Sequence, residues 1–216
     1  MTGFAGKTIP ITGAKGNLGS ALAKAFTAKG ATVVPIDLPT NLLDQAQVDI
    51  VVKKAIADFK RIDVLCNIAG GFRMGKPVHD TPDADWNFLM DLNARTVLHT
   101  ARAVVPHMIA AGGGKIVNVG AFAAQKGAAN MGAYAASKSA VIRLTETMAA
   151  ELREKNINVN CVLPTIIDTP QNRADMPKAD PGRWVAPADL ANVIVFLVSD
   201  EARAVHGATL AVTGLS

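Results

Sequence analysis

The chain has 216 residues, of which half are hydrophobic and 19% are charged, and this composition indicates one globular domain and excludes a disordered protein. The formal charge of +4 comes from scattered basic residues, so neither nucleic acid nor a membrane is an expected partner. No apolar run approaches the ~18 residues of a membrane span, and the N-terminal residues show no cleavage pattern. Cys66 and Cys161 lie in strand-like runs and are expected to be buried free thiols. We therefore expect a cytoplasmic protein.

Short apolar runs alternate along the chain with longer stretches of helical period. The expected strands are Lys7–Ile11, Ala31–Ile36, Ile62–Cys66, Lys115–Val119, Ile157–Val162 and Ala208–Val212. The expected helices are Asn17–Lys29, Leu43–Phe59, Pro82–Ala111, Ala133–Lys155 and Pro187–Ser199. This alternation predicts an α/β fold, a doubly wound parallel sheet flanked by helices, with residues 1–216 forming a single domain.

Two features interrupt the pattern. Pro10 and Pro35 fall in strands that should be internal to the sheet, although proline cannot donate to a ladder. Either these positions face a gap in the pairing, or the strand boundaries are off by one or two residues. Residues 165–184 form the only long stretch without predicted regular structure, and their polar, proline-punctuated composition is typical of a loop or lid. We refer to residues 165–184 as the substrate loop.

A glycine-rich segment, ITGAKGNLGSAL, follows the first expected strand and opens the first expected helix. A tight turn requires Gly13, the close approach of a pyrophosphate requires a residue without Cβ such as Gly16, and packing of helix on strand requires Gly19. The phosphates would lie at the helix N-terminus, where free N–H groups favour negative charge. The segment therefore predicts a dinucleotide site, with an ordinary glycine turn as the alternative.

Asp37 lies at the end of the second expected strand, where a carboxylate can bind the adenosine ribose and repel a 2′-phosphate. This position favours NAD(H) as the cofactor. Lys15 in the glycine loop could attract that extra phosphate, so NADP(H) remains possible. The alternative for Asp37 is a solvated turn residue.

Tyr134 and Lys138 are four residues apart and therefore share one face of a helix. A free tyrosine has a pKa of ~10, and a neighbouring ammonium is expected to lower it towards the working pH of a proton donor. Asn93 is a polar residue inside an apolar helix and is expected to organise a water relay behind Lys138. The alternatives are a chance pair on a solvated helix and a core or capping asparagine.

Together these motifs resemble the short-chain dehydrogenases/reductases, from the first strand to the C-terminus. The matching segments are TGAKGNLG, Asp37, Asp49-Ile50, NIAG at 67–70, Asn93, YAASK, LPTIIDT and FLVSDEARAVHGATLAVTG. The resemblance implies a Rossmann-type fold and an NAD(P)-dependent oxidoreductase with a small-molecule substrate, no metal, and a homodimeric or homotetrameric assembly. It also implies that Tyr134, Lys138 and Asn93 are catalytic.

The same resemblance implies a set of cofactor-binding residues. In it, Asp49 and Ile50 border the adenine, and Ile167 and Thr169 lie near the nicotinamide carboxamide. The full set is Gly13, Lys15, Gly16, Asn17, Leu18, Gly19, Asp37, Asp49, Ile50, Asn67, Ala69, Gly70, Tyr134, Lys138, Pro164, Ile167 and Thr169.

Two departures from the family pattern stand out. The middle glycine of the loop stands one place early, so that Asn17 occupies its usual position, and Ala121 stands where the family has a catalytic serine. Both departures are similar to the quinonoid dihydropteridine reductases, as are AGGF at 69–72 and DTPQNRADMPKAD followed by Trp184. Asn93 instead matches the wider family.

The missing serine bears on the reaction. In ketone reduction, serine and tyrosine both bind the oxygen where charge develops, and losing one such donor costs ~2.7–4 kcal/mol. A quinonoid ring gains aromatic character when it accepts a hydride, so it needs less help. We therefore expect hydride transfer from NADH to a quinonoid or similarly activated conjugated substrate, with Tyr134 as the proton donor.

The expected substrate pocket is made of Phe72, Ala121, Gln125, Met131 and Trp184. One alternative is a carbonyl or alcohol oxidoreductase in which Gln125 or Thr165 replaces the missing donor. An alternative of another class is a non-catalytic sensor that binds a dinucleotide.

Overall fold

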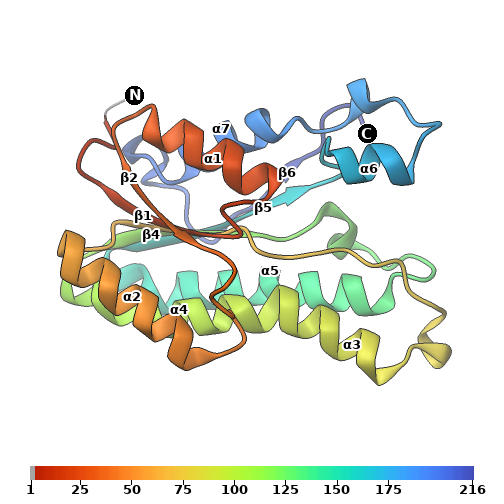
Figure 1. Cartoon of the computed structure of the whole chain (residues 1–216), viewed down its shortest axis with the longest axis horizontal. Helices are drawn as coiled ribbons and strands as arrows, with labels where there is room; N and C mark the ends of the chain where they lie inside the picture. The colour runs from red at the N-terminus through yellow and green to blue at the C-terminus, as the bar shows by residue number, and fades with distance from the viewer. Residues whose placement is uncertain (1–2) are drawn as a thin grey trace.

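Six parallel strands form the central layer of a computed structural model that describes residues 3–216 (Figure 1). The sheet order is β2-β1-β3-β4-β5-β6. The strands are β1 (Thr8–Thr12), β2 (Thr32–Ile36), β3 (Val64–Asn67), β4 (Gly114–Val119), β5 (Ile157–Pro164) and β6 (Thr209–Val212). The chain moves outwards from β1 to β2 and then returns past β1 to β3. Ligands of open α/β sheets bind at such a reversal, at the carboxyl ends of the strands.

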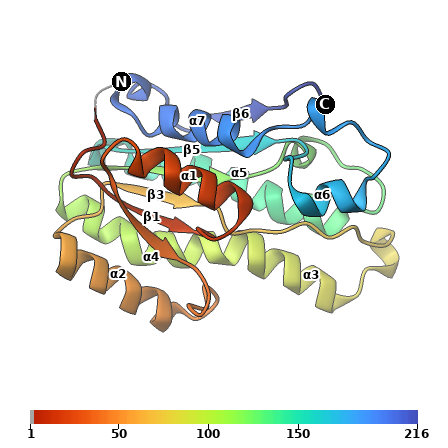
Figure 2. The same cartoon turned by 45° about the horizontal axis from the view of Figure 1, so that its top comes forward.

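Helices cover both faces of the sheet, so the expected doubly wound α/β fold is confirmed. Figures 1 and 2 show α1 (Asn17–Thr27) and α7 (Pro187–Leu197) on one face. The other face carries α2 (Gln45–Phe59), α4 (Thr96–Ala110) and α5 (Gly132–Leu152). Each face buries its own hydrophobic cluster against the strands. No helix within residues 3–216 is long and apolar enough to cross a membrane. The two cysteines are free and buried, as expected.

The expected helix Pro82–Ala111 is not one α-helix. It consists of α3 (Asp83–Met90), the π-helical segment η2 (Asp91–Arg95) and α4. A π-helical turn inside an α-helix shifts the side chains that follow it, and such turns occur frequently at functional sites. Asn93 lies within this turn and is only 1% exposed.

The two prolines have different explanations. Pro35 lies in β2, which is an edge strand, so the expectation that it would be internal was wrong. Pro10 lies in the inner strand β1, but the registered pairs of β1 with β3 are Ile11–Cys66 and Thr12–Asn67. Pro10 therefore precedes the paired residues and faces a gap in that ladder, which was the first of the two explanations offered for it.

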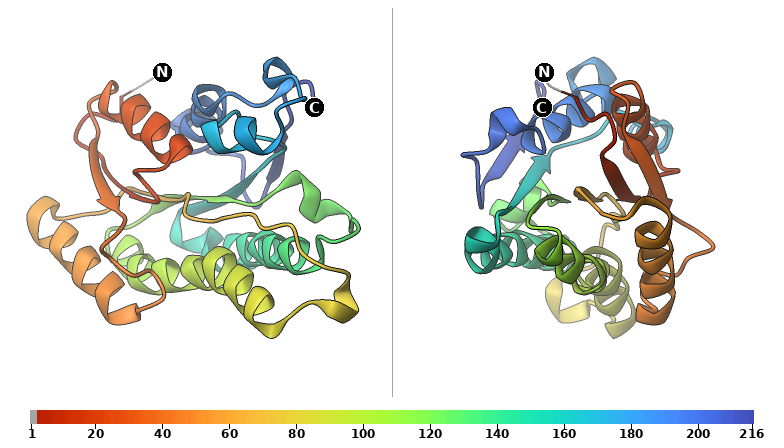
Figure 3. Two further views of the ribbon diagram at one scale, coloured as in Figure 1. Left: turned by 45° about the vertical axis from the view of Figure 1, so that its right-hand side comes forward. Right: turned by 90° about the vertical axis from the view of Figure 1, so that its left-hand side faces the viewer.

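The substrate loop is more ordered than expected, because it contains α6 (Pro170–Asp175) and the 3₁₀ turn η5 (Pro181–Arg183). Figure 3 places α6 beside the C-terminus, and the N–H of Leu215 donates to the carbonyl of Arg183. The remaining short 3₁₀ turns are η1 (Val78–Asp80), η3 (Phe122–Gln125), η4 (Arg153–Lys155) and η6 (Asp200–Ala202).

Candidate active site

The loops after β1 and β3 meet at the reversal of the sheet. The hydroxyl of Thr12 accepts the N–H groups of Ile68 and Ala69, both at 3.0 Å, and so ties the two loops together. Gly13 has φ +65°, and a Cβ there would lie 3.0 Å from the Cα of Ala69. Only glycine combines this backbone angle with so close an approach. Ala69 therefore borders the glycine loop.

The glycine loop leads into a helix with an open N-terminus. Helix α1 begins at Asn17, and its N-cap Gly16 provides no side-chain hydrogen bond. The first N–H groups of the helix thus remain available to an anion. A Cβ at Gly19 would overlap the carbonyl oxygen of Gly13, which is why the helix can pack so closely against its own loop. Leu18 is 7% exposed, so its side chain packs into the core and only its backbone can face a ligand.

Asp37 follows β2 and lies against the glycine loop. Its two carboxylate oxygens accept the N–H groups of Lys15 and Leu38, both at 2.8 Å. The ammonium of Lys15 donates to the carbonyl of Leu38 at 2.8 Å. Lys15 and Asp37 are therefore brought together beside the helix N-terminus.

Asp49 and Ile50 lie elsewhere, inside α2. The carboxylate of Asp49 accepts a hydrogen bond from the amide of Gln45 at 2.8 Å, and this amide also donates to the carbonyl of His99 in α4. Ile50 is 66% exposed. Both residues therefore lie within the expected helix Leu43–Phe59, which the structure confirms as α2, and among residues 3–216 no hydrogen bond joins them to the glycine loop.

The side chain of Asn67 belongs to the core. Its Nδ2 donates to Oδ1 of Asn118 at 2.8 Å, and its Oδ1 accepts the hydroxyl of Thr100 at 2.8 Å. Asn118 in turn donates to the hydroxyl of Thr145 at 2.9 Å. This buried chain of bonds joins β3 and β4 to α4 and α5, so only the backbone of Asn67 is left to line a groove.

Lys138 and Asn93 converge on the glycines that follow β3. A Cβ at Gly70 would lie 2.8 Å from Oδ1 of Asn93 and 2.9 Å from Nζ of Lys138. Lys138 donates to the carbonyl of Val119 at 2.9 Å. Asn93 accepts the N–H of Gly71 at 2.9 Å and donates to its carbonyl at 3.1 Å. Asn93 therefore holds the loop that faces Lys138, whereas its role in a water relay stays a prediction.

Ser137 also belongs to this cluster, although the sequence analysis did not identify it. Its hydroxyl accepts Nδ2 of Asn93 at 3.0 Å and donates to the backbone carbonyl of Tyr134 at 2.8 Å. A serine inside a helix often bonds back to the preceding turn, and its place next to Lys138 was the available signal. Through this bond the π-helical turn supports the first turn of α5.

Burial has the largest effect on the pKa values of Tyr134 and Lys138. Lys138 is 5% exposed, and loss of hydration lowers its pKa to about 8, a shift that the nearby Cys161 partly opposes. Burial raises the pKa of Tyr134 to about 12. The expectation that Lys138 lowers the pKa of the phenol was therefore wrong, because desolvation raises that pKa and the ammonium donates to the carbonyl of Val119.

The expected substrate residues differ in their environments. The ring of Phe72 meets that of Tyr134 edge-on, with centroids 4.9 Å apart. Ala121 is buried after the end of β4 and precedes η3, where Gln125 is exposed. Met131 is half-buried just before α5.

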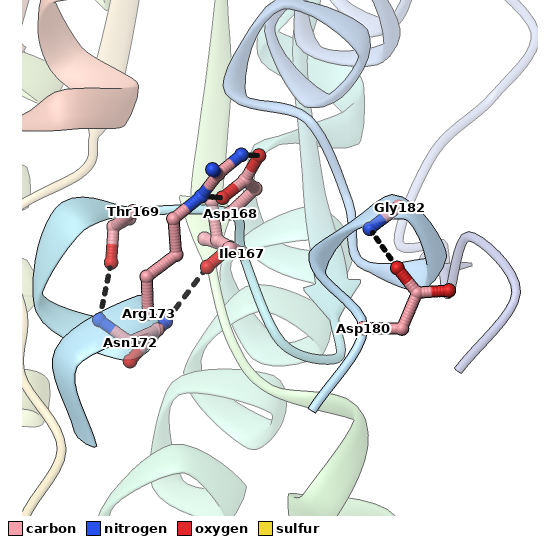
Figure 4. A network of polar contacts seen from close by, with 7 residues as sticks. All are labelled: Ile167, Asp168, Thr169, Asn172, Arg173, Asp180 and Gly182. Atoms are coloured by element: carbon pink, nitrogen blue, oxygen red, sulfur yellow. Dashed lines mark hydrogen bonds and ion pairs between the residues drawn. The ribbon is translucent and has the colours of Figure 1, made fainter. Parts of the chain in front are cut away.

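The last four expected site residues lie at the end of β5 and at the two ends of the substrate loop. Pro164 is the last residue of β5 and is buried. Ile167 pairs with Val185 in an isolated bridge, and the hydroxyl of Thr169 caps α6 (Figure 4). Trp184 is 7% exposed, so its ring packs into the protein and is not an open pocket wall.

Known proteins are similar to this chain in both sequence and architecture. A family model described as enoyl-(acyl carrier protein) reductase matches residues 21–214. A 3-oxoacyl-(acyl-carrier-protein) reductase of Thermotoga maritima is 34% identical over 97% of this chain and 97% of its own length. The chain belongs to the short-chain dehydrogenase/reductase family. It is therefore an NAD(P)-dependent oxidoreductase of small molecules.

Other family members are similarly close. An NAD-dependent glycerol dehydrogenase of Listeria innocua is 35% identical over 96% of this chain and 92% of its own length. The crystal structure of carveol dehydrogenase from Mycobacterium avium in complex with NAD is 28% identical, with a TM-score of 0.91 and coverage of 99% of this chain and 98% of that one. These relatives differ in their substrates, so membership of the family does not name the substrate of this chain.

Proposed function

We propose that this short-chain dehydrogenase/reductase transfers a hydride from NADH to a quinonoid or similarly activated conjugated ring, with Tyr134 as the proton donor. The observation that carries the proposal is the buried methyl group of Ala121, which stands after β4 where the family has a serine hydroxyl. The nearby cluster of Lys138, Asn93 and Gly70 is intact. A site that keeps this cluster but lacks the second oxyanion donor suits an acceptor that needs little oxyanion stabilisation, as in a dihydropteridine reductase.

The surroundings of the two possible replacement donors favour this reading. The hydroxyl of Thr165 donates to the carbonyl of Thr213 at 2.9 Å and lies 2.8 Å from the hydroxyl of Ser216, so the C-terminal tail already engages it. Gln125 is exposed, and a carbonyl or alcohol oxidoreductase is therefore retained as an alternative that would depend on its amide. The non-catalytic sensor is the alternative of another class.

The proposed cofactor is NADH, since Asp37 presents a carboxylate to the adenosine half of the site. Structures of two relatives support a nicotinamide dinucleotide, the carveol dehydrogenase with NAD and a 3-ketoacyl-(acyl-carrier-protein) reductase from Brucella melitensis with NADH. NADPH is the alternative. Binding of the pyrophosphate by the loop of Gly13, Gly16 and Gly19, a cytoplasmic location, and a homodimer or homotetramer all belong to this proposal.

Stopped-flow mixing of the NADH-loaded protein with a quinonoid pterin, a quinone and a simple ketone tests the proposal. We expect rapid oxidation of NADH with the first two acceptors and slow oxidation with the ketone. Rapid turnover of simple ketones would refute the quinonoid assignment, and NADH binding without oxidation by any acceptor would favour the sensor.

Two variants sharpen the result. Tyr134→Phe should lower the rate strongly with NADH binding unchanged. Ala121→Ser restores the missing hydroxyl and should accelerate ketone reduction, by up to about 10²-fold, far more than quinonoid reduction. Equal effects of this serine on both acceptors would contradict the reasoning from the missing donor.

A further inference from the structure

The base of the substrate loop is closed by backbone hydrogen bonds. The N–H of Val185 donates to the carbonyl of Ile166 at 2.9 Å, and the N–H of Asp168 donates to the carbonyl of Val185 at 2.8 Å. The side chain of Trp184 is buried beside this pairing. Both ends of the loop are therefore fixed to each other, and any local freedom is confined to the residues between them.

Four side-chain bonds then tie residues 167–169 to α6 (Figure 4). Arg173 binds Asp168 through two bonds, Nε to Oδ1 at 2.6 Å and Nη2 to Oδ2 at 2.7 Å. The amide of Asn172 donates to the carbonyl of Ile167 at 2.7 Å. The N–H of Asn172 donates to the hydroxyl of Thr169 at 3.1 Å. The short stretch after β5 is thus held from three consecutive residues.

This stretch has two donors that the pairing with Val185 does not use. In an extended chain successive N–H groups point in opposite directions, so the N–H of Ile167 points away from the pairing that uses Asp168. Among residues 3–216 it has no hydrogen-bond partner. The hydroxyl of Thr169 accepts a bond within α6 and keeps its own proton to donate. The bonds to α6 fix the directions of both donors.

We propose that Arg173 is a positioning residue, which through its double bond to Asp168 locks residues 167–169 in a form ready to receive the nicotinamide end of the dinucleotide. The inference rests on the proposed cofactor site. A pre-ordered binding stretch improves affinity because less conformational entropy is lost on binding. Arg173 itself lies outside the reacting centre and acts through Asp168.

The electrostatics of the pair support this role. The hydrogen bond from Arg173 lowers the pKa of Asp168, and Asp168 in turn raises the pKa of Arg173. Both groups therefore remain charged near neutral pH. The Arg173 side chain is 56% exposed, and exposed pairs contribute little to global stability. The two parallel bonds nevertheless restrict geometry more than a single contact does. We therefore expect a local effect on the substrate loop and only a small effect on unfolding.

The test compares Arg173→Gln with Arg173→Lys, which retains one bond, and with Lys178→Gln as a matched control. Lys178 is an exposed cation of the same loop that makes no bond to residues 167–169. Hydrogen exchange of residues 165–184 without cofactor reports order, and NADH fluorescence reports affinity. Arg173→Gln should speed exchange and raise the Kd for NADH by up to about fivefold. The kcat at saturating NADH should stay within about twofold, since the reacting groups are untouched.

The variants should form a graded series, with Arg173→Lys intermediate and Lys178→Gln like the wild type. Faster exchange with an unchanged Kd would overturn the inference, because order in the loop would then be irrelevant to the cofactor. Unchanged exchange in Arg173→Gln would also overturn the inference, because the pair would then not order the loop at all. A wild type that does not bind NADH would instead refute the proposed cofactor site, and the exchange data would show separately whether the pair orders the loop.

Discussion

The buried ammonium of Lys138 makes a prediction about stability and pH. Burial lowers the pKa of Lys138 in the folded protein to about 8, whereas the unfolded chain should show the ordinary lysine value of ~10.4. At pH values between these two pKa values, the unfolded chain binds more protons than the folded one. The free energy of unfolding should therefore rise with pH across this window. Below about pH 8 the folded protein carries the full cost of the buried charge.

The size of the effect follows from the same shift. One pKa unit corresponds to ~1.36 kcal/mol, so a fall from 10.5 to about 8 amounts to about 3 kcal/mol of destabilisation at neutral pH. Most of this should be relieved by pH 10. Tyr134 acts in the opposite sense, because burial raises its pKa to about 12 and its stabilising contribution is lost as pH rises through 10 to 12. Measurements should therefore end at pH 10.

Urea unfolding of the wild type and Lys138→Met from pH 7 to pH 10 measures the contribution. The charges of Lys138 and Cys161 influence each other, so both proteins should carry Cys161→Ala, and the remaining titrating groups are then common to both and cancel in the difference. Loss of the bond to Val119 shifts the variant by a constant amount and leaves the change of the difference with pH unaffected. We expect the wild type to gain about 2–3 kcal/mol relative to the variant across this range. A difference that stays flat or falls with pH would refute a buried ammonium.

Three further substitutions test separate parts of the site. Gly70→Ala places a methyl group 2.9 Å from Nζ of Lys138, and kcat should fall by about 10²-fold in steady-state assays; normal turnover would show that the ammonium has room to move. Asp37→Ser should lower kcat/KM with NADH and raise it with NADPH, and an unchanged ratio would exclude Asp37 from cofactor choice. Asn118→Ala leaves the amide of Asn67 without its partner, and thermal or urea unfolding should show a loss of about 1–3 kcal/mol; an unchanged midpoint would mean that the buried bonds add nothing.

The sequence predicts the sheet well, because apolar periodicity and turn residues are local signals. The expected strand Lys115–Val119 became Gly114–Val119, and the expected helix over 133–155 became Gly132–Leu152 followed by a 3₁₀ turn. The glycine loop was also predictable, since Gly16 and Gly19 lie against the backbone of Gly13 within one turn and helix, whereas the approach of Ala69 to Gly13 joins two distant segments. The location of the site at the reversal of the sheet follows from these elements together.

The features that the sequence did not reveal depend on contacts between distant segments. The π-helical turn at Asp91–Arg95 leaves no periodic signal, because it adds a single residue to a long helix. Asp49 and Ile50 match a family motif by residue type, yet Val48 and Val52 beside them are buried on one face of α2. That spacing of four is helical, and the expected helix Leu43–Phe59 already contained both residues, as α2 confirms.

The acidity of Tyr134 shows the same limit. A spacing of four residues puts the phenol and the ammonium on one face, but the sequence does not say how much water each group loses. In the structure desolvation wins, and the pKa of Tyr134 is raised to about 12. The phenol therefore stays protonated at neutral pH, which is the form that the proposed proton donor requires. Because this state depends on how much water the folded protein removes from the ring, no spacing of residues in the sequence predicts it.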